Sequence, residues 1–295
     1  TQRKSFVPLS TVLEGRKITL VHDTIIGYDP IRKCISSATR EYHYDRVVFA
    51  MGVVTSYFGL RGLDRYSYGI KSYDEVKRFR NHLHDELVHS AHLDKQYVVV
   101  GAGPTGVELA SSLSSYLEHI TDAHRIKHSR IRIKLVEAAP RILPRMSESA
   151  SQAVRSRLKS LGVTVMTNEK VEWQDDDEIS VNGRSIPTRT VVWTSGVTNN
   201  PFFEKHSGLF TLLPNKKVEV DSHLMSELST YVIGDNAGTP YSGMAQTALR
   251  DGVFVANDVK RVHFRRARKP YRSILPPVVI PVGRHWAILE WHGIR

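Results

Sequence analysis

A glycine-rich turn between a short apolar run and an amphipathic segment is the feature of this sequence that most restricts its fold. The turn reads Gly101-Ala102-Gly103-Pro104-Thr105-Gly106, and it lies between QYVVV and VELASSLSSYL. In such a strand–turn–helix unit the first glycine permits the tight turn, the second lets a pyrophosphate approach the backbone, and the third lets the helix pack close to the strand. Free N–H groups at the start of the helix favour the same anion. The segment from Gln96 to Glu137 therefore predicts a Rossmann-type unit that binds a dinucleotide.

Glu137 ends the next expected strand, IRIKLVEA, where a carboxylate would accept hydrogen bonds from ribose hydroxyls. A carboxylate there would repel the 2′-phosphate of NADP, so the sequence favours NAD(H). Its separation from the turn exceeds the usual ~20 residues, because the polar segment EHITDAHRIKHSR is expected as an insertion after the helix. The alternatives are an ordinary strand-to-helix turn for the glycines and a solvated strand end for Glu137.

The rest of the chain alternates between strand and helix patterns, which favours an α/β fold with parallel sheets. In the expected helix Ser72 to Leu87, the residues Val76, Phe79 and Leu83 recur on one face, and Ser72 with Glu75 suggests a capping box. The other expected elements are strands at 17–30, 44–52, 163–167, 190–196 and 229–233, helices at 147–162 and 244–262, a hairpin with an Asn-Gly turn at 178–186, and strands in the tail.

The net charge of +11 makes anionic partners plausible, with the densest basic runs at HFRRARK (263–269) and RIKHSRIRIK (125–134). The alternative is a generic solvated basic surface. No motif supports nucleic-acid binding, no apolar run is long enough to span a membrane, and no signal peptide is recognisable. The single cysteine, Cys34, excludes a CxxC redox centre and is interpreted as structural; no metal site is expected. Because the sequence opens TQRKSFVPLS without Met, we expect a fragment.

Three further strand ends flank the dinucleotide unit. AMG (50–52) precedes it, TSG (194–196) follows it, and YVIGD (231–235) comes later. This order indicates that the unit is inserted within a second nucleotide-binding domain. Asp235, directly after Gly234, is placed to reach the ribityl and phosphate groups of a flavin; the alternative is that it only caps the following turn.

In this order, the motifs GAGPTGVELA, VEAAPRILP, VVWTSGV, YVIGDNAG and GMAQTALRDG resemble those of two-dinucleotide-binding flavoproteins, and most closely those of type II NADH:quinone oxidoreductases. The resemblance implies two Rossmann-like three-layer domains, with the NAD domain inserted in an FAD domain. No GxGxxG precedes residue 101, so the FAD domain is expected to be incomplete. The expected domains are 1–88 and 199–262 for FAD, 89–198 for NADH, and 263–295 for the start of a C-terminal membrane-facing domain.

The resemblance assigns roles to individual residues. Glu108 matches a glutamate that faces the nicotinamide and quinone region, and its alternative is a buried helix carboxylate paired with a local base. Gln246 belongs to an alanine-glutamine motif near the flavin and the quinone. Two departures from the family pattern are Met51 in place of Thr and Arg250 in place of a second Gln. The expected cofactor-binding residues are Gly101, Gly103, Pro104, Thr105, Gly106, Glu137, Ser195, Gly196, Ala50, Gly52, Gly234, Asp235 and Ala245.

The expected function is that of an FAD-dependent oxidoreductase that passes a hydride from NADH to flavin and electrons to a quinone. The resemblance also implies a peripheral location at the cytoplasmic face of an anionic membrane, often as a homodimer, and a soluble fragment here. Two alternatives remain: a flavoprotein reductase with a protein acceptor, and a flavin-free NAD(H)-binding fragment without turnover.

Overall fold

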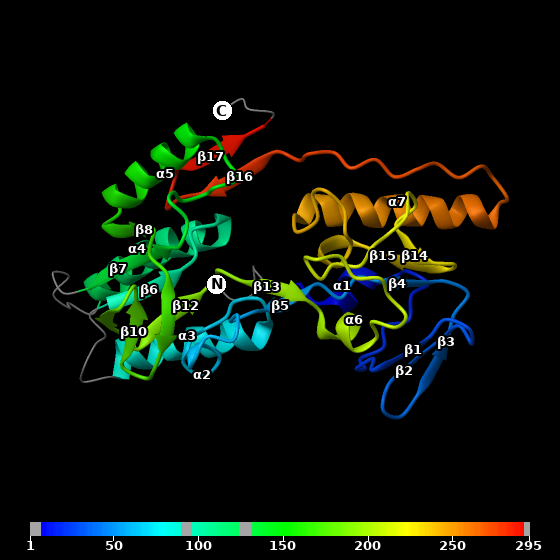
Figure 1. Cartoon of the computed structure of the whole chain (residues 1–295), viewed down its shortest axis with the longest axis horizontal. Coiled ribbons are helices and arrows are strands. Elements are labelled where there is room, and N and C mark those ends of the chain that lie inside the picture. Colours follow the sequence, from blue (N-terminus) through cyan, green and yellow to red (C-terminus); the bar gives the residue numbers. More distant parts are fainter. Residues whose placement is uncertain (1–6, 90–95, 124–130, 292–295) are drawn as a thin grey trace.

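The computed structural model describes residues 7–89, 96–123 and 131–291, which form two lobes joined by extended segments (Figure 1). The first lobe is built on a parallel sheet in the order β12-β6-β7-β8. Its strands are β6 (Gln96–Val100), β7 (Arg132–Glu137), β8 (Val163–Thr167) and β12 (Thr190–Trp193).

Both faces of this sheet are covered. Helices α3 (Tyr73–His89), α4 (Pro104–Ala123) and α5 (Glu148–Ser160) share one core with it. A second core lies against the antiparallel sheet of β9 (Val171–Gln174), β10 (Glu178–Val181) and β11 (Arg184–Pro187). Along β6, Tyr97 and Val99 enter the first core, whereas Val98 and Val100 enter the second. A strand buried on both faces is apolar throughout, as QYVVV suggests. The α/β class and the three-layer unit are confirmed.

The second lobe is built on a smaller sheet in the order β14-β15-β4, in which β15 and β4 are parallel. Its strands are β4 (Val47–Phe49), β14 (Met225–Glu227) and β15 (Thr230–Val232). Tyr231 packs with Val255 of α7 (Ala245–His263) on one face, while Phe49 packs among aromatic rings on the other. The remaining elements of this lobe are α1 (Leu9–Leu13), the sheet of β1 (Gly27–Asp29), β2 (Cys34–Ser36) and β3 (Glu41–His43), helix α6 (Pro201–Lys205) and the 3₁₀ helix η3 (Gly234–Asn236).

The chain passes between the lobes on adjacent segments. β5 (Val53–Thr55) leads into the first lobe and pairs antiparallel with β13 (Val197–Asn199), which leads out of it. Helix α2 (Leu63–Tyr66) follows β5 and packs beside β9. The first lobe is therefore inserted in the second, as the order of the motifs predicts.

The expected domain boundaries need correction. Helix α3, assigned to the flavin domain by a boundary at 88/89, shares its core with β6 through Phe79 and Leu83. The hairpin of β16 (Val278–Pro281) and β17 (Ala287–Glu290), assigned to a C-terminal domain beginning at 263, buries Ile280 and Ile288 in that same core. A segment belongs to the lobe in whose core its apolar side chains are buried, and its position in the sequence does not identify that core.

Three local expectations also need correction. Of the strand expected at Lys17 to Pro30, only β1 is a strand, and the preceding apolar side chains are largely exposed. Val76 is 45% exposed, and the buried face of α3 is Phe79, Leu83 and Leu87 instead. The start of the insertion expected after the helix, residues 118–123, continues α4 as far as Ala123. Residues 124–130 lie outside the described part. No helix in the described ranges is long and apolar enough to cross a membrane.

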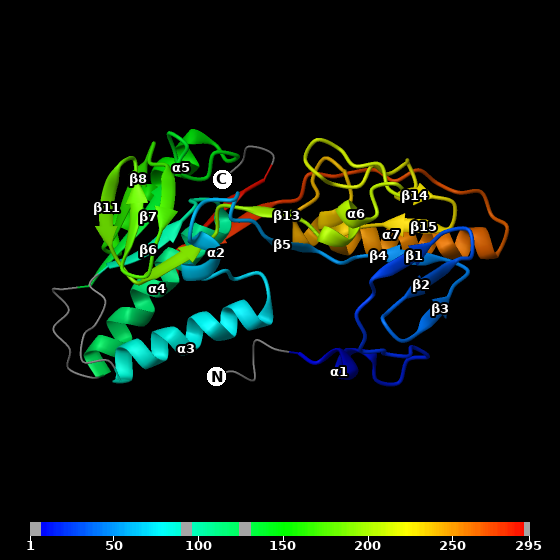
Figure 2. The same cartoon turned by 60° about the horizontal axis from the view of Figure 1, so that its bottom comes forward.

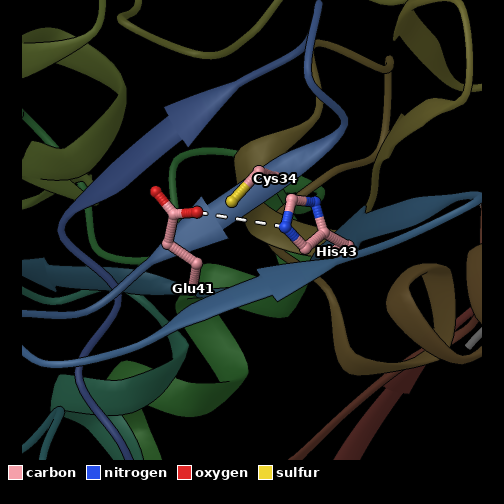
Figure 3. Close-up of side chains that lie close together, drawn as sticks. All are labelled: Cys34, Glu41 and His43. Carbon is pink, nitrogen blue, oxygen red and sulfur yellow. Dashed lines mark ion pairs between the residues drawn. The ribbon is translucent and has the colours of Figure 1, made fainter.

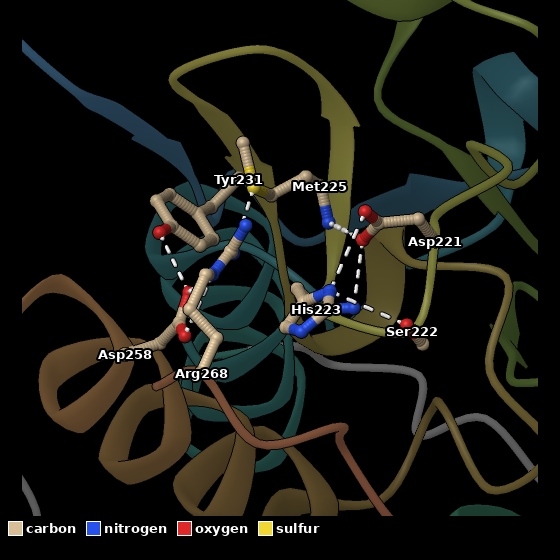
Figure 4. Close-up of polar contacts among 7 residues, drawn as sticks. All are labelled: Asp221, Ser222, His223, Met225, Tyr231, Asp258 and Arg268. Carbon is tan, nitrogen blue, oxygen red and sulfur yellow. Dashed lines mark hydrogen bonds and ion pairs between the residues drawn. The ribbon is translucent and has the colours of Figure 1, made fainter. Parts of the chain in front are cut away.

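An extended strap from residue 264 to residue 277 returns from α7 to the first lobe (Figures 1 and 2). It is anchored where Asp258, only 1% exposed, accepts hydrogen bonds from Arg268 Nε at 3.0 and 3.2 Å and from the Tyr231 hydroxyl at 2.9 Å (Figure 4). The ring of Tyr271 then packs edge-on against Phe254, one turn earlier on α7. Arg268 of the basic run HFRRARK therefore fixes the strap.

Candidate functional site

The glycine-rich turn has the local geometry that its sequence predicts. Gly101 has φ +100°, and a Cβ there would lie 2.5 Å from Ser195 Oγ. A Cβ on Gly106 would lie 1.8 Å from the Gly101 carbonyl oxygen, so only glycine lets α4 begin this close to β6. A Cβ on Gly103 would meet no atom within 4 Å. The first and third glycines are thus required by the fold, whereas the second borders open space.

The loop Thr194-Ser195-Gly196 (the TSG loop) is hydrogen-bonded to this turn. The hydroxyl of Thr194 donates to the Val100 carbonyl at 2.8 Å and lies 2.9 Å from the Gly101 carbonyl. A Cβ on Gly196 would lie 2.5 Å from the Ser56 carbonyl and 2.7 Å from the Phe58 ring. The structure therefore brings Thr194 and Ser195 next to the turn, just after β12, which pairs with β6, and places Gly196 against Ser56 and Phe58.

Glu137 is held at the end of β7 by two backbone donors. Its Oε2 accepts from Ala102 N at 2.7 Å, and its Oε1 accepts from Ala139 N at 2.8 Å. A carboxylate has about four lone-pair positions, so acceptor capacity remains for ribose hydroxyls. The carboxylate is oriented by the glycine-rich turn itself and is not merely a solvated strand end.

Glu108 lies one turn into α4 and is half-buried. Burial raises the pKa of its carboxyl group. In the described part of the chain its side chain has no hydrogen-bond or ion-pair partner. The alternative of a carboxylate paired with a local base is therefore unsupported, and burial disfavours the charged form of this carboxyl group.

In the second lobe, the buried amide of Asn236 joins three chain segments. Gly52 N donates to Asn236 Oδ1 at 2.9 Å, and Asn236 Nδ2 donates at 2.6 Å to both the Gly52 carbonyl and Asn199 Oδ1. Ala50 and Gly52, with φ +66° at the glycine, therefore meet η3 at the end of β4. Asn236 was not among the residues expected from the sequence. The sequence feature that could have indicated it is its position directly after Gly234 and Asp235.

The loop at Gly234 is held from α7. The N–H of Gly234, which has φ +64°, donates to Asp251 Oδ2 at 2.9 Å. Asp251 is fully buried, and its carboxylate interacts with the Tyr271 hydroxyl, whose pKa is raised by burial and by this carboxylate. Neither Asp251 Oδ1 nor the hydroxyl of Thr247, one turn earlier, makes a hydrogen bond of regular geometry among the described residues. Buried polar atoms such as the Thr247 hydroxyl require a partner, which can be a ligand or water.

Asp235 caps no turn through its side chain in the described structure.

The start of α7 carries the alanine-glutamine pair. Ala245 and Gln246 are exposed, the first turn holds no acidic residue, and no side chain caps the helix. Arg250 donates to the Ile274 carbonyl of the strap at 3.4 Å. The loop at Gly234 is therefore contacted by Asp251 and not by its neighbour Arg250, which replaces the family's second glutamine. Among the described residues no side-chain hydrogen bond joins Glu108 or Gln246 to another expected site residue.

The arrangement can hold two anionic cofactors of nucleotide type. The open space at Gly103 and an α4 N-terminus without acidic residues suit a pyrophosphate, with Glu137 beside them for a ribose. The buried Thr247 hydroxyl, which has no hydrogen-bond partner among the described residues, suits a polar ligand in the second lobe. The half-buried Lys217 ammonium, whose pKa is lowered by burial and raised in part by Asp235, adds positive charge there.

Comparisons with known proteins agree with this fold. The family described as pyridine nucleotide-disulphide oxidoreductase matches residues 8–252. A type II NADH:quinone oxidoreductase of Mycobacterium tuberculosis is 28% identical over 86% of the chain, which spans 60% of that relative. The type II NADH:quinone oxidoreductase of Staphylococcus haemolyticus is 23% identical over 94% of the chain and 73% of the relative.

Among solved structures, NDH2 from Plasmodium falciparum in complex with NADH superposes with a TM-score of 0.82. It is 17% identical, and the match covers 91% of this chain and 75% of that one. At this identity the likeness shows the fold, which is the two-lobed architecture described above. The similarity to the type II enzymes expected from the motifs is confirmed.

Proposed function

The chain belongs to the pyridine nucleotide-disulphide oxidoreductase family, and we propose that it serves as an FAD-dependent NADH:quinone oxidoreductase. The observation that carries the proposal is the pairing of the open Gly103 turn with the Glu137 carboxylate, held 2.7 Å from Ala102 N. Together they provide a pyrophosphate cradle and a ribose acceptor of a kind that disfavours a 2′-phosphate. The names of the relatives, type II NADH:quinone oxidoreductases, support the same donor and acceptor.

In this proposal the first lobe binds and orients NADH. Gly101 and Gly106 keep the turn tight, while Gly103, Pro104 and Thr105 would border the pyrophosphate. The TSG loop with Ser195 and Gly196 lies beside that turn through the Thr194 hydroxyl. We place the nicotinamide beside this loop, where the strand ends of the inserted lobe meet.

The second lobe holds FAD, which when bound supplies the chemistry that links a two-electron donor to the acceptor. Ala50 and Gly52 approach it at the end of β4, with Asn236 fixing the backbone there. Gly234 and Asp235 would lie at its ribityl and phosphate groups, with the Asp235 carboxylate accepting hydrogen bonds from ribityl hydroxyls. The uncapped start of α7 offers the N–H groups of Ala245 and Gln246 to a partial negative charge.

Glu108 and Gln246 are our candidates for contact with the quinone. The raised pKa of Glu108 suits a carboxyl group that keeps a proton and donates it to a reduced acceptor. Gln246 supplies an exposed amide that can bind a quinone carbonyl.

The proposal includes a peripheral position on the cytoplasmic face of an anionic membrane, and a homodimer, both from the resemblance alone. Of the basic run at 263–269, Arg268 is committed to Asp258, while Arg265, Arg266 and Lys269 remain exposed beside Phe264, which is 62% exposed. Basic residues contribute about 1 kcal/mol each near such a surface.

A visible spectrum of the chain, purified and supplied with FAD, tests the proposal. We expect flavin absorbance that bleaches when NADH is added without oxygen and returns when a water-soluble quinone follows. Glu108→Gln should leave the bleaching intact and slow the return. Bleaching that a protein acceptor reverses but a quinone does not would favour the reductase alternative. NADH binding without bound flavin would identify an NAD-binding fragment.

A further inference from the structure

Three side chains of different ligand chemistry meet on the sheet formed by β1, β2 and β3, at the outer edge of the second lobe (Figures 1 and 2). Cys34 on β2 faces His43 on β3 directly in the antiparallel register, and Glu41 lies two residues before His43. Side chains two apart on a strand share a face. Cys34, Glu41 and His43 therefore point to the same side of the sheet, and Figure 3 shows the thiol between the carboxylate and the imidazole.

The register favours close approach. The pairs on either side of Cys34 and His43 are the hydrogen-bonded ones, since Tyr44 N donates to the Lys33 carbonyl and Ile35 pairs with Tyr42. Opposite residues at the intervening, non-hydrogen-bonded position have the shortest separation in an antiparallel sheet. The thiol, carboxylate and imidazole atoms all lie within 4.8 Å of one another.

We propose that Cys34, Glu41 and His43 form a zinc site, with water at the fourth position. Thiolate, imidazole and carboxylate are the three side-chain ligands that zinc uses, at bonds of roughly 2.0–2.3 Å. Tetrahedral geometry with those bonds places the ligand atoms roughly 3.5 Å apart, so a closure of about 1 Å is needed. Glu41 and His43 are exposed and can rotate to supply it, while Cys34, at 3% exposure, is the fixed point.

One group competes with the metal. Arg32 donates to both oxygens of Glu41, at 3.2 and 2.9 Å. Both side chains of this ion pair are about half exposed, and such surface pairs contribute little to stability. Zinc therefore has to displace an exposed guanidinium and no buried group. Removing Arg32 should strengthen binding at this site and at no other.

The test uses the reduced chain without a histidine tag, stripped by a chelator, and titrates zinc alone against a chromophoric competitor. We expect one zinc per chain, at least tenfold weaker binding in His43→Ala and Cys34→Ser, and tighter binding in Arg32→Ala. Cobalt should give a thiolate charge-transfer band that Cys34→Ser loses. His263→Ala, which removes an exposed histidine at the end of α7, is the matched control and should bind like the original chain.

Equal binding by the original chain and by His43→Ala would overturn the proposal, as would the absence of binding or weaker binding in Arg32→Ala. Thermal melting without metal separates folding from binding. His43 is exposed, so its variant should melt with the original chain, and a loss of binding there cannot be attributed to unfolding.

Discussion

At the scale of single residues, the burial of Glu108 makes the stability of the folded chain depend on pH. Its pKa is raised above the ordinary 4.5 because burial disfavours the charged form. The folded chain therefore holds this proton more tightly than the unfolded chain, and stability falls as pH rises from 4.5 through the raised value. Glu108→Gln should abolish that loss, raising Tm by up to about 2 °C near pH 7 and leaving it unchanged near pH 4. Melting curves at both pH values check this; a Tm gain at low pH alone would contradict it.

Glu137 governs a second prediction at this scale. A glutamine there cannot accept from both Ala102 N and Ala139 N, which now bind one carboxylate. A ribose hydroxyl would then donate to a neutral amide in place of a carboxylate. Because hydrogen bonds to charged groups contribute about 1.5–3 kcal/mol, NADH should bind at least about tenfold more weakly to Glu137→Gln. The preference for NADH over NADPH should shrink at the same time. Fluorescence titration with both nucleotides measures it, with the exposed Glu148→Gln as control; an unchanged preference would remove Glu137 from the ribose site.

At the scale of elements, the strap depends on one buried charge. Burial by itself raises the pKa of Asp258, but hydrogen bonds from Arg268 and Tyr231 outweigh it and hold the pKa below 3.8. Leaving a buried charge without its partner costs about 3–5 kcal/mol; because Arg268 is about one-third exposed, we expect about 2–3 kcal/mol for Arg268→Ala. Arg266→Ala, exposed in the same basic run, should cost little.

Urea unfolding measures both variants. Since the pKa of Asp258 is depressed in the folded chain, the stability it confers is present above pH 3.8 and is lost as pH falls through the folded value. The difference between Arg268→Ala and the original chain should therefore narrow in acid. Equal destabilisation by Arg266→Ala and Arg268→Ala would show that the strap is not anchored through Asp258.

Local patterns predicted the elements well. Ser147 caps α5 by accepting from Ala150 N, Ser72 and Glu75 exchange backbone hydrogen bonds at the start of α3, and the Asn182-Gly183 turn has positive φ at both residues. Each depends on neighbours in sequence. The apolar pattern at 17–30 failed because alternation alone does not supply a partner strand, and only β1 finds one.

At the scale of the whole molecule, the order of the motifs predicted the insertion of one lobe in the other. It did not predict the lobe boundaries, because Phe79 and Ile288 reach one core from distant parts of the chain. The same limit applies within the site. Asn236 and Asp251 became visible only when the fold placed them against Gly52 and Gly234. Their side chains act across long sequence separations, which periodicity and motif spacing do not encode.

The central claim is that NADH binds at the glycine-rich turn of the inserted lobe. Gly103→Val tests it most directly, because a Cβ there meets no atom within 4 Å and the φ angle is not positive, whereas a bound pyrophosphate would be obstructed. As a contrast, Gly106→Ala should lower stability and binding together, since its Cβ would lie 1.8 Å from the Gly101 carbonyl.

The decisive measurement is calorimetric titration of NADH into the original chain and into Gly103→Val, with a melting curve for each. We predict that the variant melts within about 2 °C of the original chain and binds NADH at least about tenfold more weakly. Undiminished NADH binding by a folded Gly103→Val chain would contradict the account.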